Sequence, residues 1–321
     1  MKQILVIGSV ALDTIESSCG YAKEILGGSA TYFSISASFF APVNLVATVG
    51  RDFPWRHKKT IKSFGVDLKG LEIKEGKTFR WEGSYVKDMN CAETIETQLN
   101  VFADFKPCLP DGYEKSKYIF LANIDPDLQI LILKKFAGKR FIGCDSMDHW
   151  IKNKNRSLKG MIKKTSIIFL NDMEAKMLSG EHNILKAGKY LLSLGPEFAV
   201  IKRGEYGAIL FSKKFTFMAP AYLLEEVRDP TGAGDTFAGG FMGYLAKTDK
   251  ISEGTMKNAL IWGSVMASFA VQDFSINRFL NLKKRDIEER YKKFRELTSL
   301  KLYTSDIVRS VKLMQIRSLA A

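Results

Sequence analysis

The stretch Asp229-Pro-Thr-Gly-Ala-Gly-Asp235-Thr-Phe-Ala-Gly-Gly240-Phe-Met-Gly243 decides how the rest of this 321-residue sequence is interpreted. Its glycines precede a small-residue helix that we expect to begin near Gly232. The first N–H groups of a helix have no intrahelical partner and carry the positive end of its dipole, so this turn is suited to bind an anion such as phosphate. Glycine also lets the backbone approach the anion closely.

One carboxylate, Asp235, lies inside this anion-attracting turn. A site that only held phosphate would gain nothing from a negative charge, whereas a hydroxyl that attacks a phosphate needs a base to take its proton. Two other glycine loops are excluded, because no Lys follows these glycines and Phe237 occupies the third glycine position of a dinucleotide fingerprint. A tight strand-to-helix turn explains the short string Gly-Ala-Gly-Asp equally well, but the full string is more specific.

The full string closely resembles the C-terminal signature of the ribokinase-like (PfkB) carbohydrate and nucleoside kinases, and the resemblance extends over about residues 1–295. It implies an α/β fold with a central, mostly parallel sheet flanked by helices and a small β-sheet lid. It also implies transfer of phosphate from ATP, with Mg²⁺, to a hydroxymethyl group. Asp235 would then be the general base, and the N–H groups of Gly232, Ala233 and Gly234 would form the anion hole.

The composition places limits on other classes of function. The 48 Lys and Arg outnumber the 35 Asp and Glu by 13, but the basic residues are scattered and no ribonucleoprotein or zinc-finger pattern accompanies them. We interpret them as a solvated basic surface and expect no nucleic-acid partner. The four Cys and three His lie far apart, which indicates free thiols and no metal cluster. No apolar run has the length of a membrane span, so we expect a cytoplasmic protein without a membrane partner.

A second group of residues follows the first predicted strand. Asp13 comes just past the end of that strand, where ligands bind in open α/β sheets, although a loop aspartate that caps a turn is an alternative interpretation. Gly27 and Gly28 then lead into a small-residue helix. The resemblance implies that these three residues, with Ser29 and Tyr32, contact the acceptor. Tyr32 stands where the family usually has Asn.

A third group begins at Asn171, which directly follows a predicted strand. Asn171 and Glu174 resemble the Asn-x-x-Glu motif of the family, whose Glu holds Mg²⁺ through water. The same spacing is typical of a helix capping box, and both interpretations can hold together. The resemblance implies a nucleotide site formed by Asn171, Lys202, Gly204, Gly207 and Ser264. It also implies that Asp229 and Thr231 can hold a monovalent cation such as K⁺.

The resemblance implies a kinase domain over residues 1–298, with a lid from about 13–25 and 73–103 and a possible homodimer through the lid. Residues 299–321 are a C-terminal extension of unknown role. Arg80 and Asn100 could reach a substrate from the lid or could be ordinary sheet-surface residues.

The sequence leaves the acceptor open. A sugar or sugar-like molecule is the first hypothesis. A nucleoside of the adenosine or inosine kind is the alternative, because Tyr32, Phe33, Phe79 and Trp81 could offer aromatic faces to a base or could equally be core. A non-catalytic protein that binds a nucleotide or a sugar is a third, and the intact Asp235 argues against it.

Overall fold

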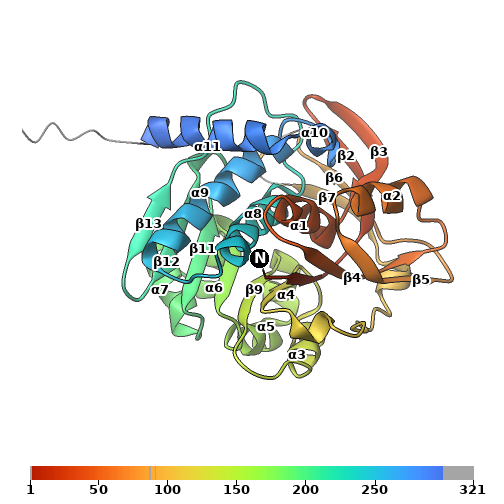
Figure 1. Cartoon of the computed structure of the whole chain (residues 1–321), viewed down its shortest axis with the longest axis horizontal. Helices are drawn as coiled ribbons and strands as arrows, with labels where there is room; N and C mark the ends of the chain where they lie inside the picture. The colour runs from red at the N-terminus through yellow and green to blue at the C-terminus, as the bar shows by residue number, and fades with distance from the viewer. Residues whose placement is uncertain (1, 87, 91, 299–321) are drawn as a thin grey trace, which may run out of the picture.

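The computed structural model describes residues 2–86, 88–90 and 92–298, so the predicted extension at 299–321 lies outside the described residues. A nine-stranded sheet runs through the molecule in the order β13-β12-β11-β10-β9-β8-β1-β4-β5 (Figure 1). Neighbouring strands from β5 to β11 are parallel, and β12 and β13 are antiparallel additions at one edge. The strands are β1 (Ile4–Ile7), β4 (Val43–Gly50), β5 (Asp67–Lys74), β8 (Tyr118–Leu121), β9 (Phe141–Asp145), β10 (Ile167–Asn171), β11 (Phe198–Lys202), β12 (Ala208–Ser212) and β13 (Thr216–Ala219). The predicted α/β fold is confirmed.

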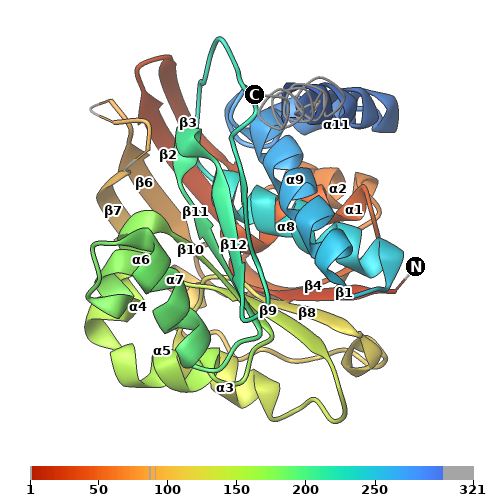
Figure 2. The same ribbon diagram turned by 90° about the vertical axis from the view of Figure 1, so that its left-hand side faces the viewer.

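Helices cover both faces of this sheet (Figure 2). One face carries α1 (Ser29–Ser38), α2 (Trp55–Ser63), α8 (Ala233–Thr248), α9 (Glu253–Ala270), α10 (Asn277–Leu280) and α11 (Lys284–Thr298). The other carries α3 (Pro126–Leu133), α4 (Asp148–Asn153), α5 (Asn155–Ile162), α6 (Asp172–Ser179) and α7 (Ile184–Ser193). Among the described residues, no helix is long and apolar enough to cross a membrane.

The central strands are apolar throughout because both of their faces are buried. In β1, Ile4 and Val6 pack into the core beneath α1 and α8, while Leu5 and Ile7 pack into the core beneath the helices of the other face. All four side chains are fully buried. A strand that faces helices on both sides needs this continuous pattern rather than an alternating one.

Helices α1 and α8 approach each other unusually closely. A Cβ atom on Gly239 would lie 2.4 Å from the carbonyl oxygen of Phe33, so only glycine fits at this crossing. The Ser36 hydroxyl also donates a hydrogen bond of 2.7 Å to the carbonyl of Thr236. Because α1 begins after Gly28 and α8 begins after Gly232, this packing holds the two glycine turns near one another.

A four-stranded sheet, in the order β3-β2-β6-β7, is the predicted small sheet. Its strands are β2 (Ala11–Ser17), β3 (Gly20–Gly27), β6 (Arg80–Ser84) and β7 (Glu93–Gln98). β2 follows β1 closely and β3 leads into α1, so this sheet stands at the carboxyl edge of the large sheet (Figure 2). The second predicted lid segment begins at about residue 73, but residues 73 and 74 are the end of β5, which pairs with β4 in the large sheet.

We expect Gly239→Ala to destabilise the protein by about 1–3 kcal/mol, because the new methyl group must push α1 away from α8. Turnover should fall with it, since both glycine turns depend on this packing. Gly254→Ala is the matched control, because nothing lies within 4 Å of a Cβ there and the helix α9 gains up to ~1 kcal/mol. Urea denaturation of both variants measures the difference, and equal stabilities would contradict the packing argument.

Candidate active site

Three polar residues end adjacent strands at the carboxyl edge of the large sheet. Asp145 ends β9, Asn171 ends β10 and Lys202 ends β11. The Lys202 ammonium donates a hydrogen bond of 2.9 Å to the Asp145 carboxylate, and both side chains are largely buried. The pair places one cation and one anion beside the start of α8.

The signature turn has the geometry that the sequence predicts. Gly232 adopts a left-handed conformation (φ +71°) as the N-cap of α8, and Ala233 is the first helical residue. A Cβ atom on Gly234 would lie 2.8 Å from the Lys202 ammonium, so this cation lies directly against the turn. The predicted donor Ala233 is already used, since its N–H donates to the carbonyl of Pro230 over 3.1 Å. The N–H groups of Gly232 and Gly234, the helix dipole and Lys202 favour an anion at the same place.

Asp235 lies in the first turn of α8 and is half-buried. Burial, and after it the nearby Asp145, raise the pKa of its carboxyl group to about 7, while Lys202 opposes both effects. A carboxyl group with a pKa near the working pH is suited to exchange a proton with a hydroxyl.

Asn171 and Glu174 form a complete capping box at the start of α6. The Glu174 N–H donates to the Asn171 side-chain oxygen over 2.7 Å, and the Asn171 N–H donates to the Glu174 carboxylate over 2.8 Å. Burial, and after it Asp145, raise the pKa of Glu174 to about 8, while Lys202 opposes the shift. Glu174 thus belongs to the same group of charges as Asp145, Lys202 and Asp235.

Asp13 lies in β2, above the other glycine turn, and is 4% exposed. A Cβ atom on Gly27 would lie 1.8 Å from the Asp13 carboxylate, so glycine is required there to leave room for it. Gly28 has φ +95°, and its N–H donates a hydrogen bond to Asp13. Ser29 is tied to Ser9, since the two hydroxyls lie 3.0 Å apart.

Burial is the main cause that raises the pKa of Asp13 to about 7. The Gly28 hydrogen bond opposes this shift, and the negative charges of Asp229 and Asp235 add to it. The carboxylates predicted for the acceptor, the cation and the proton transfer therefore interact electrostatically, as expected for residues of one site.

Asp229 joins three segments of the chain and is 1% exposed. One of its carboxylate oxygens accepts a hydrogen bond of 2.8 Å from the Thr231 N–H, and the other accepts one of 3.3 Å from the Ser275 N–H. The Ser275 hydroxyl donates in turn to the carbonyl of Leu26, next to the Gly27 turn. These contacts bring together the residues predicted to hold a monovalent cation.

The small sheet contacts the signature turn through a residue that sequence reasoning missed. Tyr85 directly follows β6, and its hydroxyl lies against the side chain of Thr231. Burial is the main cause that raises the pKa of this phenol, and Asp229, Asp13 and Asp235 raise it further. The alternation of β6 places Tyr85 on the same face as Trp81, whose register partner is Asp13. Only this register, which the sequence does not reveal, identifies Tyr85 as a residue of the site.

Two further contacts join the small sheet to the rest of the site. The Ser17 hydroxyl donates a hydrogen bond of 2.7 Å to the carbonyl of Arg228, directly before the signature. A Cβ atom on Gly204 would lie 2.0 Å from the side-chain oxygen of Asn90, so the loop after β6 touches the β11–β12 hairpin. The small sheet therefore contacts both the signature and the hairpin.

The last three residues predicted for the nucleotide site lie on the β11–β12 hairpin and on α9. Gly204 (φ +53°) and Gly207 (φ +84°) shape the β11–β12 hairpin beside Lys202. Ser264 is buried within α9, and in the described part of the chain no hydrogen bond joins it to the other predicted residues.

The side chains of Arg80 and Asn100 both make contacts within the protein. Arg80 forms ion pairs with Glu24 and Asp52, at 2.9 and 2.8 Å. The Asn100 amide donates to the carbonyl of Thr78 over 2.9 Å. Arg80 is thus a residue of β6, as one interpretation predicted, whereas Asn100 lies outside the sheet and begins a short 3-10 helix (Asn100–Phe102).

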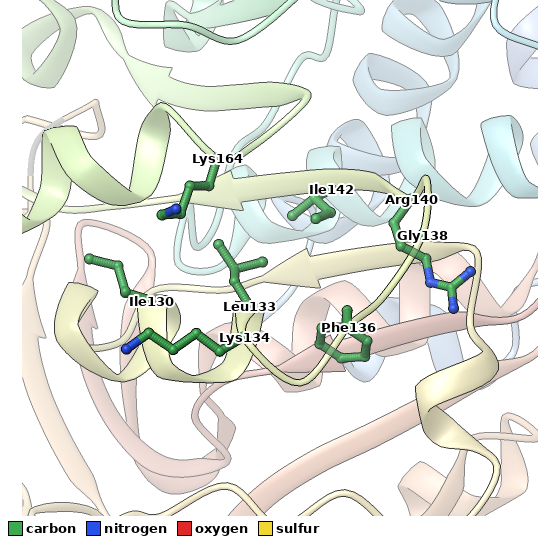
Figure 3. Close-up of a pocket in the computed structure, with 8 residues that line it drawn as sticks. All are labelled: Ile130, Leu133, Lys134, Phe136, Gly138, Arg140, Ile142 and Lys164. Carbon is green, nitrogen blue, oxygen red and sulfur yellow. The ribbon is translucent and has the colours of Figure 1, made fainter.

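A separate cavity of about 220 Å³ lies at the opposite edge of the large sheet, before β9 and β10 (Figure 3). Its lining combines the apolar side chains of Ile130, Leu133, Phe136 and Ile142 with the cationic side chains of Lys134, Arg140 and Lys164. Its lining includes no carboxylate that could accept a proton and no glycine turn at a helix start, so it does not carry the chemistry of the site described above.

We expect the ligand-free protein to become more stable as the pH falls from 8 towards 4, since Asp13 binds its proton more tightly in the folded than in the unfolded state. Asp13→Asn should remove this contribution and raise the unfolding free energy at pH 8, by on the order of 2–4 kcal/mol. The gain should shrink as the pH falls. Denaturation at several pH values tests this, with the exposed Asp111→Asn as control. A gain that does not vary with pH would contradict it.

Comparison with known proteins agrees with this geometry. Residues 1–281 match the family model described as pfkB family carbohydrate kinase. The chain is 32% identical over 258 residues to a cytidine kinase of Thermococcus kodakarensis, in an alignment that covers 79% of this chain and 92% of that protein. It is 24% identical over 293 residues to a nucleoside kinase of Methanocaldococcus jannaschii, in an alignment that covers 85% of this chain and 91% of that protein.

Solved structures share the fold. The crystal structure of the M. jannaschii nucleoside kinase aligns with a TM-score of 0.73 at 20% identity and covers 91% of this chain and 99% of that one. A putative ribokinase II from E. coli, in complex with ATP and Mg²⁺, aligns with a TM-score of 0.74 at 17% identity and covers 91% and 100%. From the family match and the likeness to the cytidine kinase, we conclude that the chain belongs to the pfkB family of carbohydrate kinases and is an ATP-dependent kinase.

Proposed function

We propose that this kinase transfers the γ-phosphoryl group of ATP to the hydroxymethyl group of a nucleoside, with Asp235 as the general base. The observation that carries the reaction is the position of Asp235 in the first turn of α8, beside the N–H groups of 232–234 and the Lys202 ammonium. A base and an anion site on one helical turn are what the attack of a hydroxyl on a phosphate requires.

The proposed step moves one proton and exchanges one P–O bond for another. Asp235 takes the proton of the acceptor hydroxyl as its oxygen forms a bond to the γ-phosphorus, and the bond to the β-phosphate oxygen breaks to release ADP. The N–H groups of Gly232 and Gly234 stabilise the negative charge on the transferring group, whereas the Ala233 N–H donates to the carbonyl of Pro230 over 3.1 Å. Lys202, held by Asp145, adds a fixed positive charge against the same turn.

We assign Asn171 and Glu174 to the nucleotide phosphates. Their capping box presents the N-terminus of α6 next to Lys202, since Asn171 and Lys202 are register partners. Among the described residues, no three His, Cys, Asp or Glu side chains converge as direct metal ligands. Mg²⁺ fits such a site because it keeps several waters and needs few carboxylates, and Glu174 would hold it through water. When bound, Mg²⁺ neutralises charge on the phosphates.

The nucleoside is preferred to a simple sugar on two grounds. Relatives named cytidine kinase and nucleoside kinase match most of the chain. In addition, Trp81 and Tyr85 lie on the face of the small sheet that carries Asp13, where aromatic rings can contact a base while Asp13 accepts hydrogen bonds from ribose hydroxyls. A sugar acceptor remains the second candidate, because the family description is carbohydrate kinase.

The acceptor is tested by measuring ADP formation from ATP and Mg²⁺ with cytidine, uridine, adenosine, inosine, ribose and fructose. We expect turnover with a nucleoside and little with the free sugars. Turnover with ribose or fructose alone would overturn the acceptor assignment, and ATP binding without turnover on any acceptor would overturn the proposed function.

Asp235→Asn should lower kcat by on the order of 10²–10⁴, the range for loss of a general base, with ATP affinity largely retained. Asp249→Asn at the other end of α8 is the control, because Asp249 caps the helix C-terminus away from the signature turn. Rapid-quench kinetics and calorimetric ATP binding separate the two effects. Wild-type turnover in the Asp235→Asn variant would exclude Asp235 as the base.

K⁺ should support faster turnover than tetramethylammonium at equal ionic strength. Asp229, Thr231 and the segment at Ser275 converge at one buried place directly before the anion turn, and a small cation there would offset the negative charge of Asp229. Asp229→Asn should abolish the difference between the two cations. Equal rates of the wild-type enzyme in both salts would exclude a functional cation site.

A further inference from the structure

The cavity at the amino ends of β9 and β10 is lined by apolar side chains that the rest of the described chain covers only in part (Figure 3). Ile130 and Leu133 of α3, Phe136, and Ile142 of β9 each pack against the core of this face but remain partly exposed. The hollow has a volume of about 220 Å³, that of roughly seven water molecules. Because contact between apolar surface and water is unfavourable, a ligand that fills the hollow gains stability by covering this surface.

Three cationic side chains surround this apolar surface. Lys134 and Lys164 extend to one end of the cavity, beside Ile130, while Arg140 stands at the other end (Figure 3). None of the eight lining residues is an Asp or a Glu. In the part of the chain that the structure describes, neither lysine forms an ion pair, and both are exposed. An anion that enters the cavity therefore meets no competing carboxylate from its lining.

Arg140 is the cation of this group that ordinary structural roles do not explain. Lys134 is the C-cap of α3 and Lys164 directly follows the C-cap of α5, and cations are favourable at the C-termini of helices. Arg140 lies in the loop before β9. Within the described residues its guanidinium donates one hydrogen bond, of 3.1 Å, to the carbonyl of Glu114, and its buried Nε–H has no partner.

Two other half-buried arginines show what a satisfied guanidinium looks like in this protein. Arg80 donates from all three of its nitrogens, and two of its partners are carboxylates. Arg290 donates to two side chains and lies 3.5 Å from the centre of the Phe269 ring. A guanidinium has five N–H donors in a fixed arrangement that suits planar acceptors. Arg140 therefore has donors available for an acceptor that the described chain does not supply.

We propose that this cavity binds a small amphipathic anion, with its apolar body against Leu133, Phe136 and Ile142 and its acidic group between Lys134 and Lys164. Arg140 donates to a hydrogen-bond acceptor at the other end of the same molecule. The volume suits a single ring or a short branched chain rather than a whole nucleotide or a polymer. Aromatic and branched-chain carboxylates, and phosphate esters of the same size, have this chemistry. The site is independent of which acceptor the kinase phosphorylates.

The cavity and the active site lie at opposite ends of the same strands. Ile142 is near the start of β9, whereas Asp145 ends this strand beside Lys202. Lys164 likewise precedes β10, which ends at Asn171. A strand of five residues spans about 15 Å. A ligand in the cavity therefore leaves the signature turn free, and both sites can be occupied at once.

The test is calorimetric titration of the full chain with benzoate, 4-hydroxybenzoate and phenyl phosphate, with benzamide as the neutral analogue of benzoate. We expect saturable binding of the three anions and at least about 10-fold weaker binding of benzamide, because benzamide cannot pair with the lysines. 4-Hydroxybenzoate should bind more tightly than benzoate, since its hydroxyl can accept from Arg140. The order of phenyl phosphate and benzoate distinguishes a phosphate ester from a carboxylate as the preferred class.

A double variant, Lys134→Glu with Lys164→Glu, should weaken benzoate binding about 10-fold or more, because repulsion replaces two attractive interactions. Lys139→Glu with Lys163→Glu is the matched control. It makes the same change of net charge at neighbouring exposed positions, and neither residue lines the cavity. At about 0.15 M salt, where charges more than about 8 Å away are largely screened, the control should bind benzoate within about 2-fold of the wild type. Saturating ADP with Mg²⁺ should leave the Kd for benzoate unchanged.

Several results would overturn the proposal. Absence of saturable binding for all three anions would do so, as would benzamide binding as tightly as benzoate. An equal loss in the two double variants would show a general effect of net charge, and displacement of benzoate by ADP would place the anion in the active site. The proposed function is tested separately, since a protein that binds benzoate here but phosphorylates no acceptor would contradict that function alone.

Discussion

The close contact between α1 and α8 is the constraint on which the site depends. Each helix begins at a glycine with positive φ, Gly28 for α1 and Gly232 for α8, and the contact at Gly239 sets the distance between the helices. The turn at Gly27 and Gly28 and the signature turn come from distant parts of the sequence, yet they lie side by side because glycines allow backbone to meet backbone. Tyr32 completes this arrangement, since its ring lies between the first turn of α1 and the N-cap of α8.

Burial disfavours the ionised form of four carboxyl groups in the site. Asp13, Asp229, Asp235 and Glu174 all have raised pKa values, and burial is the largest cause in each. Lys202 is the cation that opposes the shifts of Asp235 and Glu174. Without ligands the folded protein therefore carries unfavourable buried negative charge.

The local parts of the site could be predicted from the sequence, and the long-range parts could not. The turn at 229–235 and the capping box at Asn171 depend on residues within a few positions of each other, and their chemistry follows from spacing alone. Tyr85 was not predicted because its role follows from the pairing of β6 with β2, across about seventy residues. Lys202 was predicted through a family resemblance, but its pairing with Asp145 is visible only when β9 and β11 flank β10.

In the proposed mechanism, the large sheet and α8 carry the groups for phosphoryl transfer, and the small sheet carries groups that select the acceptor. The groups that we propose to act on the phosphate, Asp235 and Lys202, stand on α8 and the large sheet, which are continuous with the core. The groups that we propose to face the acceptor, Asp13 and Trp81, stand on the small sheet, whose β7 is exposed along most of its length. Substitutions in the exposed small sheet can therefore change the acceptor without disturbing the packed core. Tyr32 belongs to the core, and its ring lies against Gly232. A substitution that alters this ring should therefore disturb the signature turn, because the N-cap of α8 would lose the surface on which it packs.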